Sequence, residues 1–179
     1  YELPAELGIP LVIMEPVKGG SLATLPDAVT EPFKYYKPNA SISSWALRWV
    51  ASKPNVKVVL SGMTTMEQVE DNLNTFENFT PLNLKEKEIV ADVATAIKQR
   101  TKNGCTGCAY CMPCPFGVNI PQNFRIWNDL SMYENKEQAK RAYFNDLEED
   151  ARADHCQKCG KCEEVCPQAM SIRDDLERV

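Results

Sequence analysis

The side chains most able to do chemistry are eight cysteines, which stand in two short runs and nowhere else in the 179-residue chain. The second run has the spacing C-x2-C-x2-C-x3-C-P, which binds 4Fe-4S clusters through thiolates. The first run, C-x2-C-x2-C-x2-C-P, is one residue shorter. Together the runs predict two 4Fe-4S clusters with these metal ligands: Cys105, Cys108, Cys111, Cys114, Cys156, Cys159, Cys162 and Cys166.

The fourth cysteine of each run is expected to serve the cluster of the other run. Three thiolates spaced by two residues can surround one cube, whereas a fourth thiolate so close in sequence does not easily reach the remaining iron. The predicted ligand sets are Cys105, Cys108, Cys111 and Cys166 for one cluster, and Cys114, Cys156, Cys159 and Cys162 for the other.

Structural zinc and a disulfide scaffold are the two alternatives for these cysteines. Zinc uses paired C-x2-C motifs that close one tetrahedron, whereas each run here continues into a third cysteine and a C-P step. Disulfide scaffolds are small and spread their cysteines along the chain. The crowding of all eight into two runs favours iron–sulfur clusters.

The net charge and the lengths of the apolar stretches restrict which molecules and membranes the chain is expected to bind. The formal net charge is −5 at pH 7, and each 4Fe-4S core with four thiolates adds about −2, which makes the loaded chain roughly −9. Nucleic acid and anionic membranes are therefore not expected as partners. Residues 11–14 form one of the longest apolar stretches, far below the roughly 20 residues of a membrane span. No signal peptide opens the chain, and thiolates with oxygen-sensitive clusters predict a cytoplasmic location.

The residues before the first cysteine run predict the last βαβα part of an α/β protein. Apolar runs at residues 11–14 and 56–60 lack polar alternation, which is typical of parallel strands buried on both faces. A glycine loop follows the first strand, and the proline-containing stretch 23–38 is expected to be irregular or only briefly helical. A chain of this length can bury one core and carry a small appended module, which we place at residues 1–103 and 104–179.

Several helices are predicted from apolar spacing and capping residues. Asn39 or Ser41 caps a helix that buries Trp45 and Trp49. Capping boxes that begin at Thr64 or Thr65, and at Asn83, start two more helices, the second of which ends at residues 103–104. Between the cysteine runs, helices are expected from Pro121 and over residues 135–147, and a short helix closes the tail. This helical spacer is similar to the α-helical ferredoxin arrangement rather than to the small β-rich ferredoxins.

The stretches 8–22 and 59–72 resemble the seventh and eighth strands of aldo/keto reductases, with the loops and the helix that follow them. With the two cysteine runs, nearly the whole chain resembles the C-terminal half of an iron–sulfur aldo/keto reductase-like oxidoreductase. The resemblance implies a (β/α)8 TIM-barrel segment made of its last two strands and helices. It also implies that NADP or NAD binds the intact protein at the carboxyl ends of these strands.

By this resemblance, one set of loop residues lies near the pyrophosphate of the nucleotide and another near its adenosine end. The first set is Lys18, Gly19 and Gly20, and the second is Ser61, Gly62, Met63, Gln68 and Asn72. Amide groups at the start of the helix after residue 64 could also hold an anion. Tight strand-to-helix turns with no ligand are the alternative explanation of these glycine loops.

No catalytic residue is assigned to the chain. The resemblance implies that the family's Asp, Tyr, Lys and His precede Tyr1, so we expect the chain to be a fragment of a longer protein without carbonyl reductase activity. His155 is expected to be a solvated neighbour of Cys156. Neither Glu15 nor Tyr35 has a visible partner for acid–base work.

Two functions of the clusters remain open. Electron transfer to or from the nicotinamide site is the leading interpretation, although a hydride carries two electrons and a cluster passes one, and no flavin motif interconverts them here. A ferredoxin or flavoprotein partner is therefore expected. The clusters could instead be structural, because metal ligation contributes folding free energy. The strands of an incomplete barrel also predict that the fragment self-associates.

Overall fold

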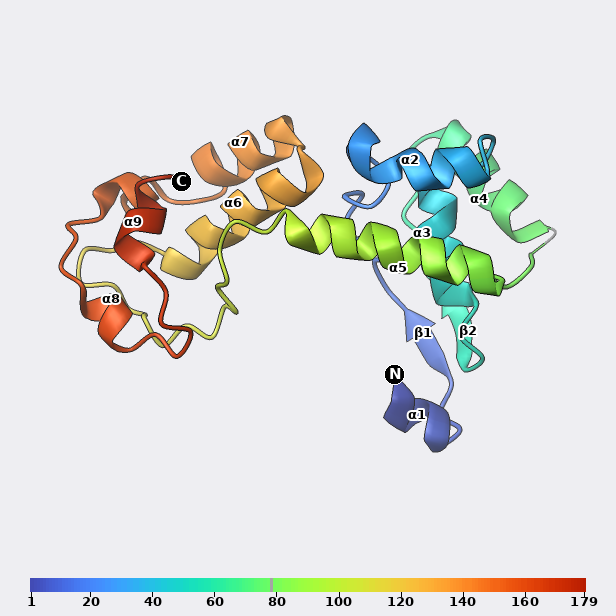
Figure 1. The fold of residues 1–179 in the computed structure, drawn as a ribbon, viewed down its shortest axis with the longest axis horizontal. Helices are drawn as coiled ribbons and strands as arrows, with labels where there is room; N and C mark the ends of the chain where they lie inside the picture. Colours follow the sequence, from blue (N-terminus) through green and yellow to red (C-terminus); the bar gives the residue numbers. More distant parts are fainter. Residues whose placement is uncertain (78) are drawn as a thin grey trace. The chain divides into compact units, whose positions relative to one another are not determined.

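The computed structural model describes residues 1–77 and 79–179. The chain forms two compact units, residues 1–97 and 98–179, and each is described by itself. Figure 1 shows a mostly helical protein with one small parallel sheet. The elements up to the boundary are α1 (Glu2–Glu6), β1 (Leu11–Ile13), α2 (Asp27–Tyr36), α3 (Ile42–Ala51), β2 (Val56–Val59), α4 (Met66–Glu77) and α5 (Leu84–Gln99). The later elements are α6 (Ile120–Tyr133), α7 (Lys136–Phe144), two short 3-10 turns (Glu149–Ala151 and Ala153–His155), α8 (Lys161–Glu164) and α9 (Ile172–Leu176).

The two strands pair in parallel, as their apolar runs predict. Leu11 faces Val56 and Ile13 faces Val59, with an irregularity between Leu11 and Val12. Helices α2 and α3 lie between the strands in the chain, and α3 packs against β2. The connection is therefore a crossover of the kind that parallel strands require.

The strands are not buried on both faces, so that expectation is wrong for this chain. The exposed fraction is 58% for Val12, 74% for Met14 and 44% for Val58. A sheet of two strands offers one face to α3, while the other face meets no further layer among residues 1–77 and 79–97. Self-association of the chain through these strands stays a prediction.

The core of the first unit lies between α2, α3 and α5. Its buried members include Val29, Phe33 and Trp45, and the Phe33 and Trp45 rings stack with their centroids 4.4 Å apart. Residues 27–36 form a continuous helix despite Pro32, so the expectation of an irregular stretch is wrong. Val29 and Phe33 are one turn apart on the same face, and burying both side chains offsets the hydrogen bond that Pro32 cannot make. Trp49 does not join this core, since 44% of it is exposed.

The helix starts follow the capping residues in the sequence. The Ser41 hydroxyl accepts a hydrogen bond from the Ser44 amide at 3.0 Å, which selects Ser41 over Asn39 as the cap of α3. The Thr65 hydroxyl and the Gln68 side chain form a capping box at the start of α4. Helix α5 ends at Gln99 rather than at residues 103–104.

A buried ion pair joins α3 to the start of α5, and its role is not apparent from the sequence. Arg48 donates two hydrogen bonds to the Glu86 carboxylate, at 2.9 Å and 3.0 Å, and Lys37 lies 2.6 Å from it. The same carboxylate completes the predicted capping box, since Glu86 and Asn83 each accept a bond from the other's amide at 2.9 Å. Burial raises the pKa of Glu86, but the bonds from Arg48, Lys37 and the Asn83 amide outweigh it and lower the pKa to about 2.

The second unit is built from helices and 3-10 turns, as expected, and no strand occurs within residues 98–179. Asn119 caps α6, and Pro121 occupies the second helical position rather than the first. Helix α7 ends at Phe144, although Leu147 is buried beyond it. The core of this unit comprises Val118, Ile120, Phe124, Ala153, Ile172 and Leu176. A search of the described residues found no helix with the length and apolar character needed to cross a membrane.

Replacing Glu86 tests the buried pair. Glu86→Gln is expected to lower the free energy of unfolding of the first unit by roughly 3–5 kcal/mol at pH 7, because Arg48 is left buried beside a neutral amide. In the wild type, the contribution of Glu86 is complete above its unfolded pKa of 4.5 and is lost as the pH falls toward about 2. Urea unfolding followed by tryptophan fluorescence, in a Trp127→Phe background, measures both effects.

Glu88→Gln is the matched control for this experiment. Glu88 lies in the same helix with its side chain 66% exposed, paired with Lys85 at 3.1 Å. Exposed pairs of this kind contribute at most about 1 kcal/mol. Equal losses for the two variants, or an unchanged acid transition in Glu86→Gln, would contradict the assignment.

Candidate functional site

The two cysteine loops share a backbone conformation. In the first loop, Gly107 and Ala109 have positive φ angles of 71° and 63°. In the second loop, the equivalent residues Lys158 and Gly160 have φ angles of 52° and 82°. The left-handed conformation costs a non-glycine residue roughly 1–2 kcal/mol, and both loops adopt it at a non-glycine position. The surrounding structure therefore holds both loops in one shape.

This shape suits a negatively charged group bound by thiolates. Alternation between right- and left-handed residues turns successive backbone N–H groups toward one side, which forms the concavities seen at many phosphate and iron–sulfur sites. The Gly107 amide already donates to the Cys105 sulfur at 3.4 Å. Amide donors directed at sulfur stabilise the thiolate form and tune a bound cluster.

Polar side chains fix the start of the first loop. The Asn128 side chain accepts hydrogen bonds from the Lys102 and Asn103 amides, at 2.9 Å and 3.0 Å, and donates one to the Asn103 carbonyl at 2.9 Å. Asn103 in turn accepts from the Cys105 amide at 2.9 Å. Sequence reasoning missed this link, because an asparagine on the buried face of α6 gives no signal of its partner.

The cysteines of the two runs lie close to one another. Burial raises the pKa of the Cys111 thiol, and the charges of Cys105, Cys108 and Cys166 raise it further. Cys166 belongs to the second run, so the structure brings it near enough for its charge to act on the Cys111 thiol.

A second group of cysteines surrounds a cavity of about 200 Å³ in the second unit. Cys156, Cys159 and Cys162 line it together with Cys114 from the first run, and Cys111 also reaches it. Burial raises the pKa of the Cys162 thiol to about 11, and the charge of Glu163 adds to this effect. A thiolate at Cys162 therefore needs a cation, which an iron–sulfur core supplies.

The exposure of the eight cysteines follows their order in the motif. The middle cysteine of each C-x2-C-x2-C triplet, Cys108 or Cys159, is exposed. The other six are partly buried and pack against the core of the second unit. All eight are free, and none of them forms a disulfide. No three His, Cys, Asp or Glu side chains within residues 1–77 and 79–179 are gathered in the way that a single metal ion requires.

A different cavity, of about 540 Å³, lies in the first unit at the carboxyl ends of β1 and β2. It brings together six of the eight residues proposed for nucleotide binding, while Lys18 and Met63 do not line it. The six are Gly19, Gly20, Ser61, Gly62, Gln68 and Asn72. Six of the eight residues therefore share one cavity, and their contacts to a nucleotide remain a prediction.

The polar groups of this cavity are engaged with one another. Asn72 donates to the Ser61 hydroxyl at 3.0 Å, and the Gln68 carbonyl oxygen accepts from the Thr64 amide at 2.7 Å. Asp71, which sequence reasoning missed, accepts from the Ser43 hydroxyl at 2.9 Å. Among the described residues that line the cavity, Glu15 and Asp71 are acidic and none is Lys or Arg. Backbone amides and neutral side chains, rather than cationic side chains, are therefore the donors that line this cavity.

Comparison with protein families matches residues 1–94 to the Aldo/keto reductase family, which is more than half of the chain. The chain belongs to the aldo/keto reductase family. Residues 104–171 match a 4Fe-4S dicluster domain, so this family member carries an iron–sulfur module after its reductase segment. Searches of curated proteins and of solved structures found no match.

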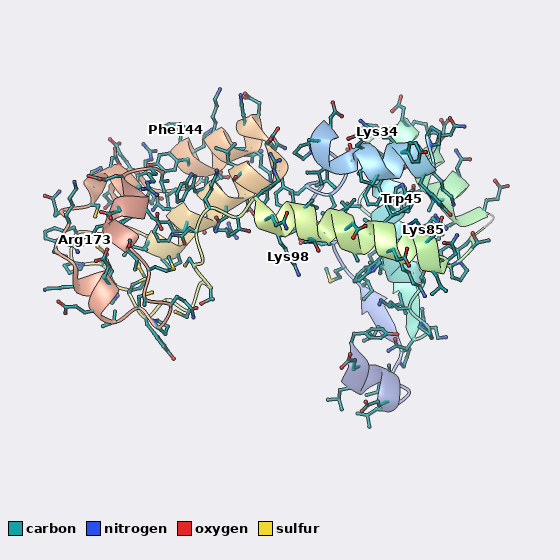
Figure 2. The ribbon with its side chains drawn as sticks, in the orientation of Figure 1. Lys34, Trp45, Lys85, Lys98, Phe144 and Arg173 are labelled. Carbon is teal, nitrogen blue, oxygen red and sulfur yellow. The ribbon has the colours of Figure 1, made fainter. Side chains whose placement is uncertain are left out.

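The two matches confirm the resemblance inferred from the glycine loops and cysteine runs, and they support an iron–sulfur oxidoreductase. His155 is exposed beside Cys156, as expected of a solvated neighbour. The main charged residues near the cysteines, Arg173 and Glu163, were missed by sequence reasoning. Arg173 is labelled on α9 in Figure 2. Eleven positions separate it from Cys162, and only folding brings it to the cavity.

Proposed function

We propose that this aldo/keto reductase chain carries two 4Fe-4S clusters that pass electrons between a protein partner and a nicotinamide-binding barrel. The observation that supports the proposal is the pair of equivalent cysteine loops, which share left-handed positions and lie where Cys114 of the first run meets the cysteines of the second run. Thiolate donors in this pattern suit iron–sulfur clusters. When bound, each cluster supplies one-electron oxidation and reduction.

The proposed ligands follow the grouping of the thiols. Cys105, Cys108, Cys111 and Cys166 would hold one cluster, and Cys114, Cys156, Cys159 and Cys162 would hold the other. The exposed Cys108 and Cys159 mark the solvent side of each site. Electron transfer weakens steeply with distance, so an exposed ligand is a suitable point of exchange with a docked carrier.

We further propose that β1 and β2 are the last two strands of a (β/α)8 barrel whose NADP or NAD lies at their carboxyl ends. The cavity there supports this proposal, since loops at the carboxyl ends of barrel strands build the active sites of such enzymes. The catalytic Asp, Tyr, Lys and His implied by the family would come from other strands. A flavoprotein or ferredoxin partner would reconcile two-electron hydride transfer with one-electron carriers.

A purely structural role is the second candidate for the clusters. It is favoured by the small core of the second unit, against which six of the eight cysteines pack. Metal ligation in such a unit contributes directly to folding. Reduction of the clusters by a nicotinamide cofactor in the intact enzyme would support electron transfer, whereas redox-inert clusters would support the structural role.

Metal analysis tests the cluster content. After anaerobic isolation, the chain is expected to contain about eight iron and about eight acid-labile sulfide, because two complete ligand sets are present. Colorimetric iron and sulfide assays with zinc quantified in parallel provide the measurement. Stoichiometric zinc with negligible sulfide would refute the proposal.

Single substitutions test the exchange of the fourth ligand between runs. Cys114→Ala is expected to disturb the cluster bound by Cys156, Cys159 and Cys162, and Cys166→Ala is expected to disturb the other. Each variant should leave a three-cysteine site with a labile iron, visible in the electron paramagnetic resonance spectrum as a new three-iron signal. If Cys114→Ala instead disturbed the cluster of Cys105, Cys108 and Cys111, each run would bind its own cube. The same conclusion would follow if Cys166→Ala disturbed the cluster of Cys156, Cys159 and Cys162.

Nucleotide titration tests the cavity of the first unit. Asn72→Ala is expected to weaken NADPH binding about tenfold, the effect of losing roughly one hydrogen bond to a charged ligand. Asn74→Ala is the control, because Asn74 is exposed on the same helix and does not line the cavity. Calorimetric titration of the cluster-loaded chain measures both. If Asn72→Ala and Asn74→Ala changed the NADPH affinity equally, or not at all, the nucleotide would bind elsewhere.

A further inference from the structure

The cavity surrounded by Cys114, Cys156, Cys159 and Cys162 has an uneven charge distribution. Three cationic side chains line it, namely Lys158, Lys161 and Arg173. Among the described residues that line it, none is Asp or Glu. Two of the three cations have acidic partners outside the lining, since Lys158 pairs with Glu177 and Arg173 pairs with Glu163.

The pair of Arg173 and Glu163 is the more firmly built of the two. Glu163 accepts from the Arg173 backbone amide at 2.8 Å and from Nε at 3.0 Å, and the second guanidinium nitrogen lies 2.8 Å away. Three contacts between two residues fix the direction of the guanidinium as well as its position. The Glu163 side chain is 22% exposed, so solvent screens it only in part.

Both members of this pair lie next to the cysteines of the second run. A side chain on Gly160, between Cys159 and Cys162, would lie 3.7 Å from a guanidinium nitrogen of Arg173. Glu163 directly follows Cys162 in α8, and its carboxylate lies 2.8 Å from the Arg173 guanidinium. The cation and the anion therefore act on the same metal site, with opposite signs.

These charges bear on the energy of adding an electron. A 4Fe-4S core with four thiolates has a total charge of about −2, and uptake of one electron makes it about −3. A nearby cation favours the more negative state and a nearby anion opposes it, with an energy that grows as water is excluded. Arg173 should therefore raise the reduction potential of the neighbouring cluster, and Glu163 should lower it.

We propose that Arg173 and Glu163 form a charge pair that sets the reduction potential of the cluster held by Cys114, Cys156, Cys159 and Cys162. The inference rests on the proposed function, because it requires a redox-active cluster at this site. Arg173 and Glu163 are positioning residues that act through the electric field and touch no substrate. The first cysteine run, residues 105–114, contains no charged residue, so the pair distinguishes one cluster from the other.

Redox titration of the loaded chain, followed by electron paramagnetic resonance, tests the pair. Arg173→Gln is expected to shift the midpoint potential of this cluster to a more negative value, and Glu163→Gln to a less negative one. The double variant should lie between them. Both single variants break the same salt bridge, so a role limited to folding would not shift the potential in opposite directions. The potential of the other cluster should move little in any variant.

Two further variants keep the test decisive. Arg178 lies in the same C-terminal segment, pairs with Asp175 at 3.6 Å and does not line the cavity. Arg178→Gln should therefore leave the potential of this cluster unchanged. Arg173→Lys retains the charge and should stay close to the wild type. If Arg173→Gln fails to load this cluster, Glu163→Gln alone still tests the direction in which the midpoint potential shifts.

Different outcomes distinguish this inference from the proposed function. A wild-type chain that lacks iron and sulfide, or whose clusters take up no electron, would refute the proposed function. A fully loaded and redox-active wild type whose potential is unchanged, or shifts the same way, in Arg173→Gln and Glu163→Gln would refute the charge pair alone.

Discussion

The second unit depends on bringing two distant cysteine runs to one small core. Six of the eight cysteines pack against the cluster that contains Val118, Phe124 and Ile172. In the proposed ligand sets, in which the last cysteine of each run joins the first three of the other, a bound cluster would connect chain segments more than forty positions apart. Ligation of that kind removes conformational freedom from the unfolded chain and stabilises the fold that creates the site.

The two cysteine loops have the same backbone shape although the residues between their cysteines differ. Ala109 and Lys158 accept the left-handed conformation that glycine would adopt without cost. Each of them stands where the other loop has glycine, since Ala109 is equivalent to Gly160 and Lys158 to Gly107. The link from Asn128 through Asn103 to the Cys105 amide fixes the start of the first loop from outside it.

The first unit has a different source of order. Its buried Arg48–Glu86 pair connects the crossover helix α3 to α5, and the aromatic stack of Phe33 on Trp45 fills the space between α2 and α3. These contacts hold the helices, while the strands present one uncovered apolar face and a cavity at their carboxyl ends. The helices thus position the loops that form this cavity.

Cysteine spacing, glycine loops and capping residues determined much of this protein from the sequence alone. They identified the two cysteine runs, proposed six residues that share one cavity, and located the starts of α3, α4 and α5, because each signal acts over a few neighbouring positions. Only the tertiary structure decided that residues 27–36 stay helical through Pro32, that Trp49 is exposed, and that Glu86 pairs with Arg48. It also decided that Arg173 reaches the second cysteine group. Burial and charge pairing join residues that are distant in the chain, and no local pattern records which of them will meet.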